Sequence, residues 1–306
     1  MESVIHFFFS AHMDTVEPGK GISPRIDGDY IVSDGTTILG TDNKLALACM
    51  LVLACDLVLT HSSHCPLEFV FTRSEEIGNY GALHFDYSLL RSKRGLCFDS
   101  GNPVGTIVRA SPFYDRFDII FSGQSAHASR PDQARNVLFP FADLLARFPP
   151  GKLDDYSVLN YGVVQAGSVR NTIPGELRVF GEVRSFSEDQ ISVYDKSLEV
   201  HVSAVSAAHS VRGDVRIDRE NPGYFFPEDD VFIEELAELM HAVDITPRVI
   251  ESWGVSDANI FNDRGLRCLN LGHGGEFIHT VQERVSLGEV ERLYRLMRVL
   301  VSSRFV

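Results

Sequence analysis

Histidine and carboxylate side chains recur in this sequence directly after short apolar segments. His12 and Asp14 follow "VIHFFFSA", Glu75 and Glu76 follow "LEFVFT", Asp99 ends "GLCFD", and His279 follows "LRCLNLGHGGEFI". Two histidines and several carboxylates, with no cysteine among them, are ligands that suit Zn²⁺ or a related divalent cation. The residue types therefore indicate a metal centre.

The spacing within two of these groups suggests a division of roles. In the adjacent pair Glu75 and Glu76, one carboxylate can bind metal while its neighbour acts as a general base on a metal-bound water. Asp14 lies two residues after His12, and we expect it to accept the second ring N–H of His12 and so fix its tautomer. Taken singly, each residue also has an ordinary explanation, such as an acidic pair at a helix N-terminus for Glu75 and Glu76.

The segments that precede these residues predict a sheet of buried strands flanked by helices. Strands are expected at Val4–Ala11, Leu67–Thr72, "GLCFDS" and "LRCLNLG", and helices at "KLALACMLVLACDLVL", Asp229–Val243 and Leu287–Ser303. Strands that alternate with helices indicate an α/β fold with a mostly parallel sheet. Because ligands bind at the carboxyl ends of the strands in such sheets, the candidate ligands are expected to converge there.

The middle of the chain has a different pattern. From Pro112 to Asp218, segments such as "YDRFDIIFSG" and "ELRVFGEVRSF" alternate apolar and polar residues, as strands with one solvated face do, and helices are expected near Asn136–Phe148 and Glu188–Ala208. We therefore expect a smaller α+β domain, residues 112–218. It would interrupt a discontinuous metal-binding domain formed by residues 1–111 and 219–306.

Composition restricts the partners and the compartment. The 28 basic and 42 acidic residues give a formal net charge of -14, which argues against a nucleic-acid partner. The five cysteines form no CxxC pair and are expected to be reduced, buried thiols. The apolar run Val4–Phe9 is too short for a signal peptide or a membrane span. We expect a cytoplasmic protein that binds no membrane.

Eight motifs along the chain resemble those of one enzyme family. They are "SAHMDTVEPG", "GTDNKLALA", "TRSEEIGNYGA", "CFDSG", "GQSAHASRP", "RNTIPGELRVFGEVRSF", "SDANIF" and "GGEFIHTVQERV". In this order they resemble the co-catalytic di-zinc peptidases, which include peptidase T, carboxypeptidase G, the aminoacylases and succinyl-diaminopimelate desuccinylase. "HMDTVEPG" followed by "YIVSDGTTILGTDNK" is most similar to the peptidase T-like branch.

The resemblance implies a ligand set for two zinc ions, with Co²⁺ or Mn²⁺ as possible substitutes. His12 and Asp99 would hold one ion, and Glu76 and His279 would hold the other. Asp42, in "GTDNK", would bridge them and would precede a cis peptide bond.

The resemblance also implies roles for five further residues. Glu75 would be the general base, and Asp14 would orient His12. His127, in the inserted domain, would reach the site of a partner subunit and stabilise the oxyanion. Asn171 and Arg184 would bind the carboxylate or backbone of the substrate.

The chain departs from the family pattern at two points. Asn43 stands where the family usually has a second aspartate, which removes a charge near the site, and we expect the change to be tolerated. The family also carries some tens of mostly helical residues before its first metal-binding strand, whereas this sequence begins almost at that strand. Either a trimmed architecture or an incomplete start is expected.

The function expected from the resemblance is metal-dependent hydrolysis of an amide bond. The first expectation is an aminopeptidase or tripeptidase acting on short peptides, as a homodimer assembled through the inserted domain. Deacylation of an N-acyl amino acid or carboxypeptidase activity is the alternative within the same chemistry. A non-catalytic metal-binding dimer is the alternative from a different functional class.

Overall fold

The computed structural model describes residues 7–302, which fold into two compact units. Unit 1 contains the chain up to Ser111 and from Tyr224 onward, and unit 2 contains Pro112–Gly223. The expected second boundary, between residues 218 and 219, differs from this division. The reason is that β13 (Arg212–Asn221) stays paired with β7 (Phe113–Ser122) as far as Asn221.

Unit 1 is built on a mixed sheet in which most neighbouring strands are parallel. Its strands lie in the order β14 (Tyr224–Phe225), β6 (Thr106–Ser111), β16 (Arg267–Gly272), β5 (Arg94–Ser100), β1 (Phe7–His12) and β4 (Leu67–Thr72), and β15 (Arg248–Glu251) also pairs with β6. The pairs β16–β5, β5–β1, β1–β4 and β15–β6 are parallel, whereas β6 runs antiparallel to β16 and β14. The expected α/β fold is confirmed. Residues 4–6 of the first predicted strand lie outside the described residues.

Strand β1 is buried along its whole length because it lies between two other strands and beneath helices. All six of its residues are buried, which is why its sequence is a continuous apolar run up to Ser10 rather than an alternating one. Phe8 packs edge-on against Phe261, and Phe9 packs edge-on against Phe98. The strand therefore holds its last residue, His12, at the end of a rigid core element.

Helices surround this sheet. They are α1 (Thr41–Thr60), the short α2 (Tyr80–Leu83), α5 (Val231–His241), α6 (Asp257–Asp263) and α7 (Leu287–Ser302), with a 3₁₀ turn at Tyr87–Leu89. The Asp230 carboxylate caps α5 by accepting the Phe232 N–H at 2.9 Å, and Ser256 forms a capping box with Asn259 at the start of α6. The predicted helices 229–243 and 287–303 are found at these positions, although Ser303 itself is not described.

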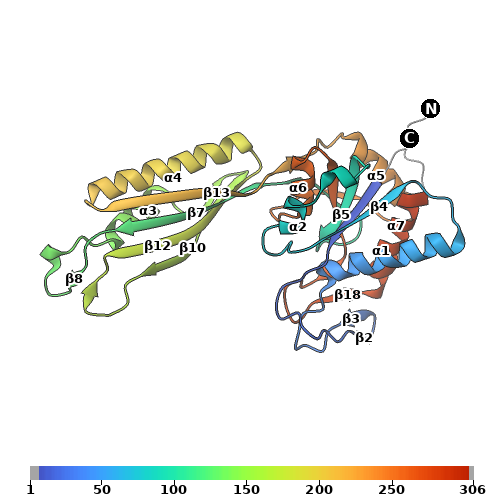
Figure 1. Ribbon diagram of the computed structural model, residues 1–306, viewed down its shortest axis with the longest axis horizontal. Helices are drawn as coiled ribbons and strands as arrows, with labels where there is room; N and C mark the ends of the chain where they lie inside the picture. Colours follow the sequence, from blue (N-terminus) through green and yellow to red (C-terminus); the bar gives the residue numbers. More distant parts are fainter. Residues whose placement is uncertain (1–6, 303–306) are drawn as a thin grey trace. The chain divides into compact units, whose positions relative to one another are not determined.

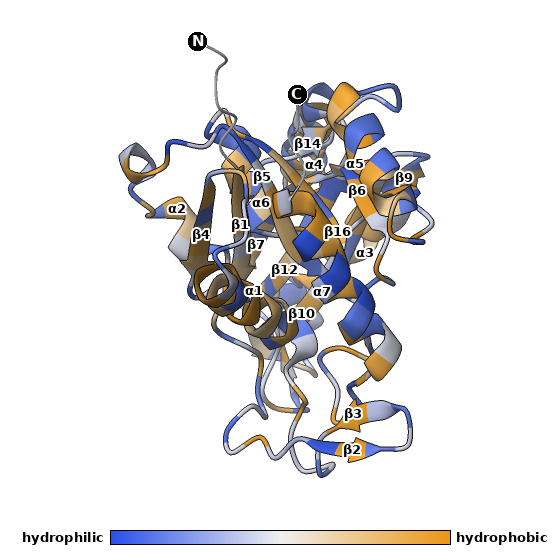
Figure 2. Ribbon diagram, turned by 90° about the vertical axis from the view of Figure 1, so that its right-hand side faces the viewer, coloured by the Kyte–Doolittle hydropathy of each residue, from blue (hydrophilic) through white to orange (hydrophobic). Residues whose placement is uncertain are grey.

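Helix α1 is apolar on both faces, as its colouring in Figure 2 shows. By length and composition it could cross a membrane. In the structure Met50 and Leu53 are buried in the core of unit 1, while Val58 and Leu59 on the other face are exposed. It is therefore a core helix covered on one face only.

The expectation that all five cysteines are buried is wrong for two of them. All five are free thiols, and Cys49, Cys97 and Cys268 are buried as expected. Cys55 is exposed because it lies on the uncovered face of α1, and Cys65 is only partly buried.

A small antiparallel sheet is formed by two segments, one that precedes α1 in the sequence and one near the end of the chain. Its strands are β17 (Gly275–Glu276), β18 (Arg284–Ser286), β3 (Tyr30–Val32) and β2 (Arg25–Asp27), in this order. The segment between β17 and β18 carries His279. This sheet thus links the loop of His279 to the chain that leads into α1.

Unit 2 is an antiparallel sheet with helices on one face (Figure 1). The strand order is β13, β7, β12 (Glu176–Ser185), β10 (Ser157–Ala166) and β9 (Gly151–Asp154), and the helices are α3 (Leu138–Arg147) and α4 (Glu188–Ala208). A separate pair, β8 (Ala126–His127) and β11 (Thr172–Ile173), and a 3₁₀ turn at Pro131–Gln133 complete the unit. On β7, Phe117, Ile119 and Phe121 are buried against the helices, which explains the alternation in the sequence.

Replacing Gly95 by alanine is expected to destabilise unit 1. Gly95 of β5 lies opposite Phe8 of β1, and a Cβ atom there would lie 2.1 Å from the Phe8 ring. Because both strands are buried, we expect a loss of about 1 to 3 kcal/mol in the free energy of unfolding, measured by urea denaturation. Gly288→Ala, at an exposed position in α7 with no atom closer than 3.8 Å to the added Cβ, is the control. Equal stability of the two variants would contradict this packing.

Candidate metal centre

The candidate ligands come from five separate parts of unit 1. His12 ends β1, Asp99 lies near the end of β5, and Glu76 follows β4. These three strands are parallel neighbours, so their carboxyl ends lie at the same edge of the sheet, as predicted. Asp42 lies at the start of α1, and His279 lies in the loop after β17.

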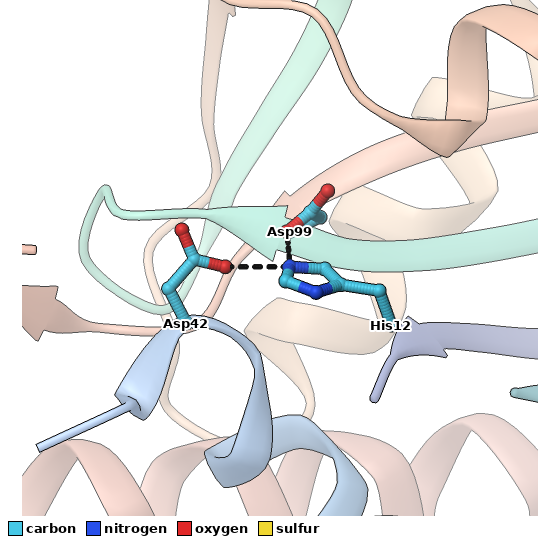
Figure 3. A group of neighbouring side chains, drawn as sticks. All are labelled: His12, Asp42 and Asp99. Atoms are coloured by element: carbon cyan, nitrogen blue, oxygen red, sulfur yellow. Dashed lines mark hydrogen bonds and ion pairs between the residues drawn. The ribbon is translucent and has the colours of Figure 1, made fainter. Parts of the chain in front are cut away.

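Asp42 and Asp99 approach the same nitrogen of His12 (Figure 3). His12 Nε2 lies 2.9 Å from Asp42 Oδ1 and 3.3 Å from Asp99 Oδ1. All three side chains are buried or nearly so. Two acidic oxygens thus face one imidazole nitrogen.

The other carboxylate oxygen of Asp42, Oδ2, belongs to a second group of candidate ligands. His279 Nε2 lies 3.2 Å from Asp42 Oδ2 and 3.2 Å from Glu76 Oε1. Asp42 therefore directs one carboxylate oxygen toward each histidine, which is the arrangement a bridging ligand requires. Its peptide bond to Asn43 is cis, as the resemblance implies.

The spacing of these atoms fits a pair of divalent cations. Two ligand atoms that each lie about 2.0 Å from one tetrahedral zinc ion are about 3.3 Å apart, close to the separations of 2.9 to 3.3 Å found here. Glu76 Oε1 is buried and makes no hydrogen bond, although it lies close to the His279 ring. Carboxylate oxygens and imidazole nitrogens suit zinc, cobalt or manganese.

Burial and mutual repulsion raise the pKa values of two carboxylates in the cluster. Burial, together with the negative charge of Asp99, raises the pKa of Glu75 to about 10. Burial and the charge of Asp42 raise the pKa of Asp99 to about 7, although His12 acts in the opposite direction. A hydrogen bond with Asp42 raises the pKa of His279 to about 9. Bound cations would favour the ionised carboxylates instead.

Asp14 makes more contacts than the sequence suggested. The nearest acceptor of His12 Nδ1 is the main-chain oxygen of Asp14, at 3.1 Å, and the Asp14 carboxylate lies at 3.5 Å. That carboxylate accepts the main-chain N–H groups of Glu75 at 3.1 Å and Glu76 at 3.2 Å. Burial opposes ionisation, but these hydrogen bonds and His12 lower the pKa of Asp14 to about 2. Asp14 therefore orients both His12 and the glutamate pair.

Sequence reasoning did not identify the residues that hold Glu75. Asn79 Nδ2 donates to Glu75 Oε1 at 2.9 Å and to Asp257 Oδ1 at 3.0 Å. The buried Asp257 also accepts the hydroxyl of Thr72, the last residue of β4. Asn79 and Asp257 lie in the motifs "SEEIGNYGA" and "SDANIF", and this was the only signal for them in the sequence.

Asp99 is also held by amide side chains. Asn43 Nδ2 donates to Asp99 Oδ1 at 2.8 Å, and Asn270 Oδ1 accepts the main-chain N–H of Asp99 at 2.9 Å. An aspartate at position 43 could not donate in this way while ionised. The departure at Asn43 thus adds a hydrogen bond to one of the candidate ligands.

His273, six residues before His279, is fully buried in unit 1. Its Nδ1 accepts the main-chain N–H of Gly275 at 3.1 Å. Burial lowers its pKa, although the charges of Asp42 and Glu283 act in the opposite direction. It is therefore a neutral histidine beside the cluster and not one of the candidate ligands.

A pocket of about 580 Å³ opens beside the cluster. Its lining includes Asp42, Glu75, Glu76, Asp99 and His279, and continues over Ser100, Gly101, Asn102, Ser252, Gly254, Val255, Asn270, Gly275, Phe277 and Ile278. None of these lining residues is lysine or arginine. The cluster is thus accessible to a small substrate.

The remaining predicted residues lie in unit 2. His127 is exposed on β8, where its Nδ1 lies 2.8 Å from the hydroxyl of Ser129. The main-chain oxygen of Asn171 accepts the N–H of Ala128. Arg184 on β12 pairs with Glu182 and lies over the Tyr114 ring. None of the three residues His127, Asn171 and Arg184 belongs to the unit 1 cluster, and their roles stay predictions.

Comparison with known proteins finds a family model that matches this chain and solved structures that are similar to it. The model of "Peptidase family M20/M25/M40" matches residues 8–303. The aminopeptidase PepT of Bacillus cereus is 31% identical, with a TM-score of 0.93 over 99% of this chain and 81% of that chain. A tripeptidase of Staphylococcus aureus is 28% identical, with a TM-score of 0.95 over 98% of this chain and 80% of that chain. The succinyl-diaminopimelate desuccinylase of Stenotrophomonas maltophilia is 26% identical over 96% of this chain and 83% of its own length.

Zinc binding to the metal-free protein at pH 7 is expected to release protons. Because the pKa values of Glu75 and Asp99 are raised, Glu75 is protonated and Asp99 partly protonated at pH 7, and both ionise when a cation binds. Titration calorimetry in buffers with different ionisation enthalpies measures the release. Glu75→Gln should release fewer protons, whereas Glu276→Gln, outside the cluster, should match the wild type. A binding enthalpy that does not depend on the buffer would contradict the raised pKa values.

Proposed function

Because this chain belongs to the peptidase family M20/M25/M40, we propose that it is a metal-dependent aminopeptidase that releases the N-terminal residue of short peptides. The observation that carries this proposal is the position of Asp42, whose two oxygens face His12 and His279 separately. A general-base candidate, Glu75, lines the same pocket. This combination supports hydrolysis of an amide bond by an activated water.

In the proposed mechanism the cluster holds two zinc ions. His12 and Asp99 would bind one ion, Glu76 and His279 the other, and Asp42 both. The chemistry that such a pair supplies when bound is a water of lowered pKa and a polarised substrate carbonyl.

Glu75 transfers the protons in this mechanism. It accepts a proton from the attacking water and then donates a proton to the leaving amine. Asn79 holds Glu75 Oε1, so we assign the proton transfer to Oε2.

Similarity supports a peptide substrate. The similar solved structures include an aminopeptidase and a tripeptidase. The pocket lining in unit 1 offers no lysine or arginine side chain that could bind an anionic acyl group. The second candidate, a deacylase or carboxypeptidase, is favoured by similarity to the desuccinylase. For either substrate we assign Asn171 and Arg184 to binding of the substrate carboxylate or backbone.

A substrate panel tests the proposed activity. Tripeptides, dipeptides and N-acetyl amino acids are incubated with the zinc-loaded protein, and we expect cleavage of the tripeptides after the first residue. Removal of metal by a chelator should abolish the cleavage, and Zn²⁺, Co²⁺ or Mn²⁺ should restore it. Cleavage of N-acetyl amino acids alone would support the deacylase. Binding of two zinc equivalents without any turnover would support a non-catalytic dimer.

Glu75→Gln separates the proposed base from the metal ligands. We expect kcat to fall by about 10² to 10⁴-fold, because a positioned general base contributes this much, while zinc still binds. Glu276→Gln is the control, since Glu276 pairs with Arg284 and is not among the candidate ligands. Undiminished turnover in Glu75→Gln would refute the role of Glu75.

We assign to unit 2 the assembly of a cytoplasmic homodimer in which His127 stabilises the oxyanion in the site of the partner subunit. Its exposure leaves the His127 ring accessible to a second chain. This assignment rests on the resemblance to the family. It can be tested separately from the metal chemistry.

Mixing two inactive variants tests the shared site. After subunit exchange between His127→Ala and Glu75→Gln, each heterodimer contains one intact site. About a quarter of the wild-type activity should therefore return, because half of the dimers are heterodimers and half of their sites are intact. Mixing Glu75→Gln with Glu76→Gln is the control, since every site then keeps one defect. No recovery in the first mixture, or a monomer in sedimentation equilibrium, would contradict the assignment.

A further inference from the structure

Helix α1 begins without a capping side chain of its own. The residue before its first turn is Gly40, which has a φ of 75° and offers no side chain to the N–H groups at the helix start. Asp42 follows two residues later, where the main chain of Asp42 and Asn43 departs from helical geometry before α1 continues. The main chain that carries the bridging carboxylate therefore needs a hydrogen-bond acceptor from elsewhere.

Glu283 supplies that acceptor from the other end of the sequence. Its side chain is buried, with a relative exposure of 1%. Glu283 Oε2 accepts the Gly40 N–H at 2.7 Å, and Oε1 accepts the Asp42 N–H at 3.3 Å and the Thr41 hydroxyl. One buried carboxylate thus binds three consecutive residues, and its negative charge is favourable at a helix N-terminus.

Glu283 is also tied to the other histidine ligand. It lies four residues after His279, in a turn closed by hydrogen bonds from the Thr280 hydroxyl to the Phe277 oxygen, at 2.7 Å, and from the Glu283 N–H to the Thr280 oxygen, at 3.1 Å. The same short segment therefore carries His279 and holds the main chain of Asp42. This explains how two ligands more than two hundred residues apart keep a separation of 3.2 Å.

We propose that Glu283 is a positioning residue that fixes Asp42 relative to His279, so that both oxygens of Asp42 can serve as metal ligands. The proposal rests on the proposed function, in which Asp42 is shared between two cations. A residue that orients a ligand in this way contributes to metal affinity without touching the metal.

Calorimetric titration of the metal-free protein with ZnCl₂ tests this role. The wild type should bind two equivalents. Glu283→Gln should weaken zinc binding by about 10 to 100-fold, because its amide group would bring a donor toward the N–H groups of Gly40 and Asp42. Glu276→Gln is the matched control, since Glu276 lies on the same segment and pairs with Arg284 at the surface. It should bind zinc as the wild type does.

A purely structural role would give a different result. If Glu283 only caps α1, Glu283→Gln should lower the thermal stability of the metal-free protein and leave the zinc affinity unchanged, which would overturn the proposal. If that variant does not fold, Thr41→Val, which removes one donor to Glu283 and preserves volume, decides: a several-fold loss of zinc affinity supports the role, and unchanged affinity overturns it. Failure of the wild type to bind zinc would instead refute the proposed function.

Discussion

The electrostatic repulsion among buried carboxylates at one edge of the unit 1 sheet is the constraint on which the site depends. Asp42, Glu75, Glu76 and Asp99 line one pocket, and the two imidazoles of His12 and His279 cannot compensate four negative charges. Buried charges of one sign are tolerated only when protons or cations balance them. The raised pKa of Glu75 is one sign of this constraint, and the proposed pair of cations would relieve it.

The parallel strands make this concentration of charge possible. Strands β4, β1 and β5 end at one edge of the sheet. They pack against the hydrophobic core of unit 1, which leaves their last residues little freedom to move apart. Further residues then restrict the ligands individually: Asp14 holds the glutamate pair, Asn79 holds Glu75, and Asn43 holds Asp99. The site is therefore rigid because both the sheet and the surrounding hydrogen bonds oppose relaxation.

The sequence predicted many of the helices and strands, and it predicted side chains that the structure brings together at one edge of the sheet, because both leave local signals. The apolar run before His12 predicted a buried strand, and α4 was predicted over the residues where it is found, Glu188–Ala208. The contact between Glu283 and Gly40 was not predictable, because a cap supplied from 243 residues away leaves no pattern near the helix. The domain boundary was misplaced for a similar reason: the end of β13 is determined by its pairing with β7, whereas the local composition changes earlier.

The uncharged amide of Asn43 has a consequence for the loaded centre. Two divalent cations would balance the four carboxylates that line the pocket, so Asp14, beside His12, would leave the occupied site with a small negative charge. A carboxylate at position 43 would add another negative charge. With Asn43, the long-range field of the loaded centre would repel an anionic peptide less than it would with an aspartate there, and selection between substrates would depend more on short-range contacts in the pocket.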